Sequence, residues 1–278
     1  MLLFSENSEN KMEFSEKCDL LKRNIYKTGG LAVAFSGGVD SSLIAAVAQQ
    51  ELGSRALAVT ALSPTYSTRE QKFSAILAKQ IGIKHITVES NELDIPEFAD
   101  NPENRCYYCK RELFAVVKEI ANEHGIGFVA DGTNIDDLND HRPGMKAADE
   151  AAVLQPLLDA GFLKEDVRRL SREMNLPTAD KPAMACLASR FPYGSRITEE
   201  KIWAIDKVEN SLRNFGFCNI RVRHHGDIVR IEVGEKEIAR LCLPEIRMKL
   251  IAVAKSVGFL YVTADLQGYR TGSMNEGL

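Results

Sequence analysis

The stretch LAVAFSGGVDSSLIAAVAQQEL, residues 31–52, decides the fold. It begins with an apolar run of strand length, continues through two glycines and three serines, and ends in the pattern of an amphipathic helix that starts at Leu43. The free N–H groups at the start of a helix favour an anion, and glycines let the backbone approach a ligand closely. The stretch therefore predicts a phosphate-binding loop made by Ser36, Gly37, Gly38, Ser41 and Ser42.

Asp40 distinguishes this loop from the commoner phosphate loop, G-x-x-x-x-G-K-[ST], which needs a lysine for the β- and γ-phosphates. No lysine lies between Lys27 and Lys72. A carboxylate beside phosphates is explained if Mg²⁺ lies between them, because hard cations bind a carboxylate together with substrate phosphates. The alternative is a Gly-Ser turn that is capped by Asp or Ser and binds no ligand.

The composition is that of a soluble globular protein with one large domain or two smaller ones. The chain has 278 residues, of which 45% are hydrophobic and 27% charged. The start of the chain does not have a basic segment followed by an apolar one, and no apolar run is long enough for a membrane span, so we expect a cytoplasmic protein without membrane contact. The net charge of −4 argues against nucleic acid as a partner.

Apolar runs of strand length alternate with helical patterns in the first part of the chain; they cover residues 31–35, 55–62, 85–90 and 126–132. This alternation predicts an α/β fold, a parallel sheet with helices on both faces. In such sheets ligands bind beyond the carboxyl ends of the strands, which is where Ser36, Ser63 and Asp131 follow their strands.

After residue 180 the pattern changes to that of a smaller α+β domain. It predicts a helix over 199–217, a hairpin that turns at His225-Gly226-Asp227, a second helix over 235–258 and a last strand over 259–266. We therefore expect a nucleotide-binding domain, a smaller C-terminal domain and a disordered tail, with the respective boundaries 1–180, 181–270 and 271–278.

Polar residues also follow the other strands. Asp131, Gly132 and Asn134 come directly after the run that ends the predicted sheet, where Asp131 would hold Mg²⁺ opposite Asp40; a capped turn would look similar. Ser63 is expected near the adenine or ribose of a nucleotide. Arg69 is either a phosphate contact or a solvated residue at the start of a helix.

Cys106 and Cys109 are three residues apart, which brings both thiols to one side of a helical turn. A closed zinc site needs four ligands, and the sequence has no second C-x-x-C. With Cys186 as a third thiol, the set fits an iron–sulfur cluster that has one open iron. The alternative is a pair of buried helix thiols, and we expect the remaining cysteines to fill the core: Cys18, Cys218 and Cys242.

Several motifs resemble known families. SGGVDSS resembles the pyrophosphate loop of the N-type ATP pyrophosphatases (PP-loop enzymes), which implies an adenine nucleotide alpha hydrolase-like fold and attack on the α-phosphate of ATP, with pyrophosphate and an adenylated substrate as products. PAMACLASRFPYGSRIT (182–198), taken with CYYCKRELF (106–114), DGTNIDD (131–137) and IRVRHHGDIVRIEV (220–233), is similar to the LarE group. That group makes pyridinium-3,5-bisthiocarboxylic acid mononucleotide for the nickel-pincer cofactor, and the similarity covers roughly residues 15 to 270.

The resemblance implies that a carboxylate of a pyridinium mononucleotide is adenylated and then sulfurated, with ATP and Mg²⁺ as cofactors. One branch of the group sacrifices the sulfur of a single loop cysteine, to which Cys186 corresponds. Another uses three cysteines to hold a [4Fe-4S] cluster that carries an extra sulfide, and Cys106 and Cys109 favour this branch. The source of the sulfide stays open.

The same resemblance implies that Arg221 and Arg223 bind the phosphate of the substrate, with Glu209 nearby and Arg190 as a further phosphate or adenylate contact. It also implies a homo-oligomer, a trimer or a hexamer built of trimers. With Cys186, the arginine pair and Glu209 make up the predicted catalytic set. A solvated, charged hairpin face is the alternative, and we expect His224 and His225 to be exposed turn residues outside the site.

Three other functions remain compatible with these motifs. A tRNA-thiolating PP-loop enzyme should show a basic face, whereas the sequence pI is about 5.8. An ammonia-dependent synthetase would not need three cysteines. A nucleotide-binding sensor without catalysis would release no pyrophosphate with any substrate.

Overall fold

The computed structural model describes residues 12–139, 143–182, 185–270 and 273. The chain forms two compact units, each assembled from separated stretches. The first unit comprises the described residues of Met1–Ala61, Lys72–Val88 and Lys110–Ala183, and the second those of Leu62–Gln71, Glu89–Cys109 and Met184–Leu278. Apart from Ser273, the tail predicted to be disordered lies outside the described residues. No helix within them is long and apolar enough to cross a bilayer.

The first unit is built on a four-stranded sheet with the strand order β3-β2-β1-β4, in which β1 pairs in parallel with β2 and with β4. The predicted α/β fold is therefore confirmed. All four residues of β1 are buried, as expected for the central strand of a sheet covered on both faces. The strands are β1 (Leu31–Ala34), β2 (Ala56–Leu62), β3 (Lys84–Glu89) and β4 (Val129–Ala130).

β4 is shorter than the run 126–132 that the sequence predicted. The carbonyl of Phe128, just before β4, accepts from the N–H of Ala32 (2.9 Å), and Leu154 extends the sheet edge as an isolated parallel bridge to Ala130. The N–H of Asp131 donates to the carbonyl of Leu154 (3.0 Å), so this distant segment helps to fix the first residue after β4.

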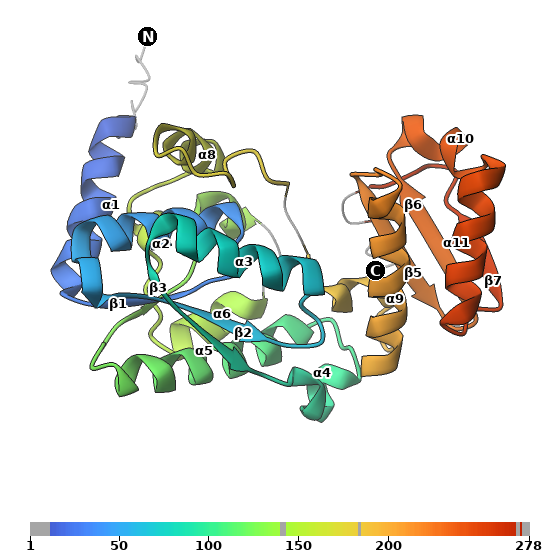
Figure 1. The fold of residues 1–278 in the computed structure, drawn as a ribbon. Helices are drawn as coiled ribbons and strands as arrows, with labels where there is room; N and C mark the ends of the chain where they lie inside the picture. Colours follow the sequence, from blue (N-terminus) through green and yellow to red (C-terminus); the bar gives the residue numbers. More distant parts are fainter. Residues whose placement is uncertain (1–11, 140–142, 183–184, 271–272, 274–278) are drawn as a thin grey trace, which may run out of the picture. The chain divides into compact units, whose positions relative to one another are not determined.

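The long helices cover both faces of this sheet: α2 and α3 lie on one side and α5 on the other (Figure 1). Right-handed crossovers require this arrangement, because the chain moves from β1 to β2 to β3 in one direction and then returns to β4. The sheet order consequently reverses between β1 and β4, where ligands bind in such folds. The helices up to residue 173 are α1 (Phe14–Thr28), α2 (Val39–Leu52), α3 (Thr68–Ile81), α4 (Pro96–Ala99), α5 (Arg105–Glu123), α6 (Pro143–Glu150), α7 (Pro156–Asp159) and α8 (Lys164–Glu173).

Helix α2 differs from the predicted amphipathic helix in two ways. It begins at Val39 rather than Leu43, so Asp40, Ser41 and Ser42 belong to its first turn. It is also buried along nearly its whole first ten residues, because α1, α7 and α8 pack against it from outside while β1 lies beneath it. A helix covered on all sides needs apolar and small residues all round rather than one apolar stripe.

The second unit contains a three-stranded sheet, β5-β6-β7. β5 and β6 form the predicted antiparallel hairpin, and β7 adds to β6 in parallel. Helices α9 and α11 pack together, and α9 also packs against β5 (Figure 1). The elements are a 3₁₀ turn over Leu187–Arg190, α9 (Glu199–Asn214), β5 (Ile220–His225), β6 (Ile228–Val233), α10 (Ile238–Leu241), α11 (Pro244–Ser256) and β7 (Tyr261–Ala264).

The prediction of a single helix over 235–258 is wrong. The chain instead forms a short 3₁₀ turn, the one-turn helix α10 and then α11. Pro244 causes the break, because it has no N–H to continue a preceding helix and its fixed φ suits the first position of a new one.

Candidate active site

The predicted phosphate loop connects β1 to α2 in the first unit. Gly38 is the N-cap residue of α2, and its carbonyl accepts from the hydroxyl of Ser42 (2.6 Å). The hydroxyls of Ser36 and Ser41 lie 3.1 Å apart, and the N–H of Gly38 donates to Ser36 Oγ (3.3 Å). The serine hydroxyls therefore shape the loop itself at the positive end of the helix dipole.

Gly37 has a positive φ of 66°, in the left-handed region that favours glycine. A Cβ built on Gly37 would lie 3.2 Å from Cβ of Ser74 in α3. Both the backbone conformation and the space beside α3 therefore require glycine here.

Asp40 lies in the first turn of α2 and is held by two other segments. Lys164 Nζ donates to both of its carboxylate oxygens, at 2.6 and 2.7 Å. Asn134 Nδ2 donates to Asp40 Oδ1 at 3.1 Å and to Asp137 Oδ2 at 3.0 Å. Asn134 is completely buried, so its amide fixes the loop after β4 against the phosphate loop.

Asp131 lies at the end of β4 and is 5% exposed. Its Oδ1 accepts from the N–H of Thr133 (3.1 Å), and Lys110 Nζ is 3.6 Å from its Oδ2. Because β1 and β4 are adjacent, the loops that contain Asp40 and Asp131 follow neighbouring strands at the same edge of the sheet.

Three lysines that the sequence motifs did not reveal reach these loops from other parts of the chain: Lys110, Lys164 and Lys181. Lys181 Nζ donates to the carbonyl of Gly37 (3.0 Å) and lies 3.9 Å from the ring centroid of Phe73. The absence of a lysine within the loop sequence therefore did not mean an absence of positive charge at the loop. No local pattern marks these lysines, because they are brought there by α5, by α8 and by the chain after α8.

Gly132 allows the closest approach in this site. A Cβ built on Gly132 would lie 2.8 Å from Asp40 Cβ and 3.0 Å from the N atom of Ser41. Neither Asp40 Cβ nor the backbone of Ser41 can move aside for an added Cβ, as the end of a long flexible side chain could. The loop after β4 thus packs directly on the first turn of α2.

We expect Gly132→Ala to lower the free energy of unfolding by about 1–3 kcal/mol, the usual cost of overpacking, and to weaken nucleotide binding through displacement of Asp40. Urea denaturation and titration with a nucleotide measure the two effects. Gly127→Ala is the matched control, because a Cβ there meets no atom within 4 Å. Equal stability and affinity in the two variants would contradict this packing.

The cysteines of the C-x-x-C motif lie in the first turn of α5. Cys106 is exposed and Cys109 is half-buried against the core of the second unit, so the alternative of two buried thiols is wrong. Cys186 is exposed and directly precedes the 3₁₀ turn over Leu187–Arg190. All three cysteines belong to the second unit, yet among the described residues no three Cys, His, Asp or Glu side chains are arranged for a single metal ion.

The other cysteines differ from the expectation of core filling in two cases. Cys18 is buried in α1, and burial raises the pKa of its thiol. Cys218 and Cys242 are exposed instead. They lie after the end of α9 and of α10, outside the helical faces that pack into the core.

Arg190 is 1% exposed and holds the segment that contains Cys186. Its Nη1 donates to the carbonyls of Ala185 (2.8 Å) and Cys186 (2.9 Å). Its other side forms a bidentate pair with Glu209 in α9, with distances of 2.8 and 3.2 Å. These protein groups accept the hydrogen bonds that Arg190 donates. Arg190 therefore fixes the backbone at Ala185 and Cys186.

Glu209 is 2% exposed and also accepts from Arg213 (3.3 Å) and from the N–H of Val222 (3.3 Å). Burial alone would raise the pKa of this carboxyl, but the charges and hydrogen bonds of Arg190, together with Arg213, outweigh burial and hold the pKa below its ordinary value. Glu209 is therefore a charged anchor between α9, β5 and the Cys186 segment.

We expect Glu209→Gln to lower the free energy of unfolding by about 3–5 kcal/mol, because it leaves Arg190 buried beside an incomplete partner. Glu173→Gln is the control, since the exposed pair of Glu173 with Arg169 should contribute less than about 1 kcal/mol. Urea denaturation at neutral pH measures both values.

The same pair predicts a pH dependence. The pKa of Glu209 is lower in the folded protein than the ordinary 4.5. The ionised carboxylate therefore contributes its full stabilisation above pH 4.5, and this stabilisation is lost as the pH falls through the folded-state pKa. The stability of the wild type should therefore fall more steeply in acid than that of Glu209→Gln. If the free energy of unfolding fell with the same slope in both proteins as the pH is lowered, this role of Glu209 would be contradicted.

Arg221 and Arg223 lie in β5 and are both buried. Arg223 pairs with Glu232 through two contacts of 3.1 and 3.0 Å and donates to the carbonyl of Ser189 (3.0 Å). Arg221 has no ion pair to a carboxylate within the described part of the chain; it stacks over the Tyr269 ring with Cζ 4.9 Å from the centroid. Burial lowers its pKa, and the charges of Arg190 and Arg223 lower it further, while Tyr269 and Glu209 act in the opposite direction.

The remaining predicted site residues belong to the second unit as well. Ser63 follows β2, is 9% exposed, and donates to Glu92 Oε1 (2.8 Å), which also accepts from Thr65. Arg69 is exposed in the first turn of α3. The buried Glu92 carries no signal in the sequence, because only the fold brings it to Ser63.

His224 and His225 are strand residues rather than exposed turn residues, and both are half-buried. The ring of His224 lies between those of Phe191 (5.1 Å) and Phe259 (5.3 Å). Burial, with a smaller contribution from Lys201, lowers the pKa of His224 to about 4. His224 is therefore a neutral core residue at physiological pH.

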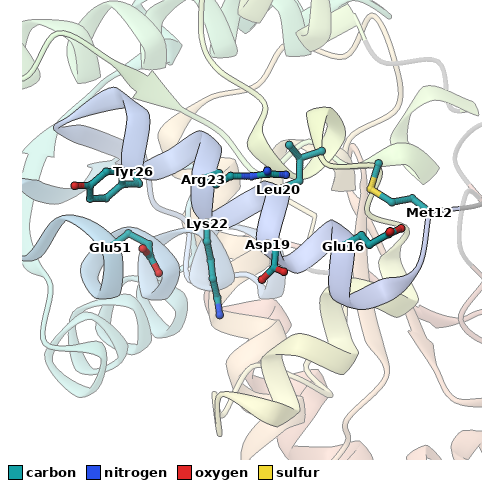
Figure 2. Close-up of a pocket in the computed structure, with 8 residues that line it drawn as sticks. All are labelled: Met12, Glu16, Asp19, Leu20, Lys22, Arg23, Tyr26 and Glu51. Atoms are coloured by element: carbon teal, nitrogen blue, oxygen red, sulfur yellow. The ribbon is translucent and has the colours of Figure 1, made fainter.

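The first unit also has a surface cavity of about 680 Å³ on the outer side of α1 (Figure 2). Its lining combines acidic, basic and apolar side chains, all but Glu51 from α1 or the residues just before it. None of the site residues predicted from the sequence lines it. The cavity does not contribute to the candidate active site.

The fold and the loop define a class of protein: an α/β protein whose phosphate loop leads from the first strand into the first sheet helix at the point where the strand order reverses. In agreement, residues 21–126 match the asparagine synthase family. The chain belongs to the family of pyridinium-3,5-bisthiocarboxylic acid mononucleotide synthase: it is 37% identical to the protein of that name from Lactiplantibacillus plantarum over 249 residues, which cover 89% of this chain and 90% of that relative. The predicted LarE resemblance is therefore confirmed.

Two further relatives describe the range of similarity. An uncharacterised protein of a Synechocystis strain is 43% identical over 246 residues, which cover 88% of this chain and 92% of the relative. One component of the glutamine-hydrolysing GMP synthase of Methanococcus vannielii is 28% identical over 190 residues, or 61% of this chain and 58% of the relative.

Proposed function

We propose that this protein is an ATP-dependent sulfurtransferase that converts pyridinium-3,5-biscarboxylic acid mononucleotide to its thiocarboxylic acid for the nickel-pincer cofactor. It activates a substrate carboxylate by adenylation, with release of pyrophosphate, and then replaces AMP by sulfide. The observation that carries the proposal is the junction of Asp40, Lys164 and Asn134 at the start of α2, in a chain of this family.

The phosphate loop suits ATP because its chemistry is complementary to phosphates. The start of α2 offers N–H groups, and Lys164 and Lys181 supply ammonium groups within reach of the loop. Gly37 and Gly132 leave a backbone cradle that a Cβ would fill. Asp40 and Asp131 have the hard oxygen ligands that Mg²⁺ prefers, and Mg²⁺ when bound neutralises phosphate charge.

Lys164 has a defined part in this proposal. It neutralises Asp40 through both carboxylate oxygens. A cation that takes over this carboxylate leaves the ammonium group of Lys164 available for the phosphates. Preorganised positive charge of this kind stabilises the charge that develops at the α-phosphate and on the leaving pyrophosphate.

Arg221 is the residue we assign to the substrate phosphate, together with Arg223. Arg223 is already neutralised by Glu232, whereas Arg221 carries a buried charge that no carboxylate of the described residues pairs with directly. A phosphate beside Arg221 would complete the charge balance, and the planar guanidinium suits phosphate geometry. Arg190 and Glu209 act by positioning Cys186. Ser63 and Arg69 are assigned to the nucleotide from the sequence resemblance.

For sulfur transfer we propose a [4Fe-4S] cluster held by Cys106, Cys109 and Cys186. The donor set would suit such a cluster, because iron–sulfur clusters are held by cysteine thiolates. Two of the thiols are exposed and the third is half-buried. When bound, the cluster supplies an open iron that can carry sulfide and be reloaded after each turnover.

The remaining parts of the proposal follow the family resemblance. Residues 1–180 act as the PP-loop domain and residues 181–270 as the sulfur-transfer domain. The protein works in the cytoplasm as a homo-oligomer, a trimer or hexamer, with a small-molecule substrate and without nucleic acid.

The experiment that tests this function uses the full chain, purified without oxygen, with ATP, Mg²⁺, the dicarboxylate mononucleotide and sulfide. We expect AMP and pyrophosphate to appear only when the mononucleotide is present, and mass spectrometry to find oxygen replaced by sulfur in the product. An amide formed from ammonia would instead identify a synthetase, and thiolation of tRNA the other PP-loop class. Absence of pyrophosphate with every substrate would identify a sensor.

A further inference from the structure

Arg105, the first residue of α5, is a buried cation whose donors are not satisfied. It is only 7% exposed, and its Nε and Nη1 atoms are buried with no hydrogen-bond partner within the ranges that the structure describes. No ion pair to a carboxylate forms at its guanidinium in that part of the chain. Buried polar groups are nearly always hydrogen-bonded, so an exception needs an ion or a water to explain it.

The position of Arg105 is fixed by the loop in front of it. Asn101 is completely buried with a positive φ of 57°, and its Nδ2 donates to the carbonyl of Pro192 (2.7 Å). The N–H of Gly194 donates back to the carbonyl of Asn101 (2.9 Å). Between these two bonds lies Tyr193, whose ring centroid is 4.7 Å from Cζ of Arg105. The guanidinium is thus held against a ring by two stretches of chain that are tied together.

An anion explains this arrangement better than the ring or a water does. The Tyr193 ring attracts the cation but accepts none of its in-plane N–H groups. A water would satisfy donors but would leave the buried charge uncompensated. The start of the 19-residue helix α5 adds partial positive charge, and its first turn has no acidic side chain. Both features point to a missing negative charge beside Arg105.

We propose that Arg105 binds a small anion at the start of α5 and that this anion is hydrosulfide, the form in which sulfide reaches the proposed sulfur-transfer site. Cys109 is four residues after Arg105 and therefore on the same face of the helix, and Cys106 is the next residue. Hydrosulfide is an anion, so holding it beside the two cysteine sulfurs requires a counter-charge. Arg105 provides it. This inference rests on the proposed sulfur transfer and leaves adenylation untouched.

The test is a titration of the full chain with sodium hydrosulfide, without oxygen, followed by calorimetry and by the NMR signal of the Arg105 Nε–H group. We expect one hydrosulfide per chain and a shift of that signal. Arg105→Gln should weaken binding by about tenfold or more, the effect of one charge-assisted hydrogen bond. Arg105→Lys should keep part of the affinity because it keeps the charge.

Arg196→Gln is the matched control: Arg196 follows Tyr193 in the same segment and is a cation, but it is exposed and paired with Asp100 at 2.6 Å. Its hydrosulfide affinity should equal that of the wild type. Thermal unfolding of each variant establishes that it is folded. Equal affinity of folded Arg105→Gln and wild type would overturn the proposal, and so would a wild type that binds no hydrosulfide.

A second titration, with pyridine-3,5-dicarboxylate, distinguishes hydrosulfide from a substrate carboxylate. Binding of the dicarboxylate that depends on Arg105, in the absence of hydrosulfide binding, would overturn the assignment of the anion. Failure of the proposed function has a separate signature, because pyrophosphate release with the mononucleotide does not involve Arg105. Loss of hydrosulfide binding with normal pyrophosphate release removes only this inference.

Discussion

Asp40→Asn should lower the rate of pyrophosphate release by at least about 100-fold, the size of effect seen when a preorganised charge contact is removed. Asparagine keeps the shape of the side chain but cannot neutralise Mg²⁺. The variant also leaves Lys164 without the carboxylate that holds it at 2.6 Å. The measurement is the rate of pyrophosphate formation with saturating ATP and mononucleotide.

Asp180→Asn is the control for this prediction. Asp180 also pairs with a basic residue of α8, Arg172 at 2.7 Å, but the pair is exposed and lies outside the phosphate loop. Its rate should stay within about twofold of the wild type, as expected for a surface ion pair. If Asp40→Asn were as active as Asp180→Asn, the assignment of the loop carboxylate to Mg²⁺ would have to be abandoned.

Cys186→Ser should abolish formation of the thiocarboxylate while pyrophosphate release continues. Cys186 lies in the second unit, whereas the phosphate loop and its lysines lie in the first, so the substitution leaves the contacts of the phosphate loop unchanged. Serine has nearly the same size but is a poor ligand for iron and cannot donate sulfur. Quantifying pyrophosphate and the sulfur-containing product in one reaction separates the two half-reactions.

Cys218→Ser is the matched control, because Cys218 is another exposed thiol of the second unit. We expect it to form product at the rate of the wild type. Loss of pyrophosphate release in Cys186→Ser would show that this cysteine serves the nucleotide site, and normal product formation would show that it serves neither half-reaction.

Arg190 holds the segment that contains this cysteine. From the family resemblance it was expected to contact a phosphate or the adenylate, but the fold surrounds it with protein acceptors, among them the carbonyl of Cys186 and the carboxylate of Glu209. A side chain of this kind controls where a neighbouring residue lies. Its role depends on partners that are far away in sequence and cannot be read from its own motif.

The elements that could be predicted from the sequence are those with local causes. The strand–loop–helix unit at residues 31–52 follows from an apolar run, two glycines and three serines, and the β5–β6 hairpin follows from the turn at His225-Gly226-Asp227. The split between α10 and α11 was missed even though Pro244 is visible in the sequence, because an apolar periodicity continues across it.

By itself, the sequence determined the α/β class and predicted the phosphate loop with Asp40 and the candidate cysteines, because backbone conformation and helix-terminal charge depend on neighbouring residues. Only the tertiary structure decided which charges stand beside them. Lys164 reaches Asp40 across 124 residues of chain, and Arg105 is buried with no acidic partner among the described residues. Charge pairing depends on distance in space, and long-range packing alone sets that distance.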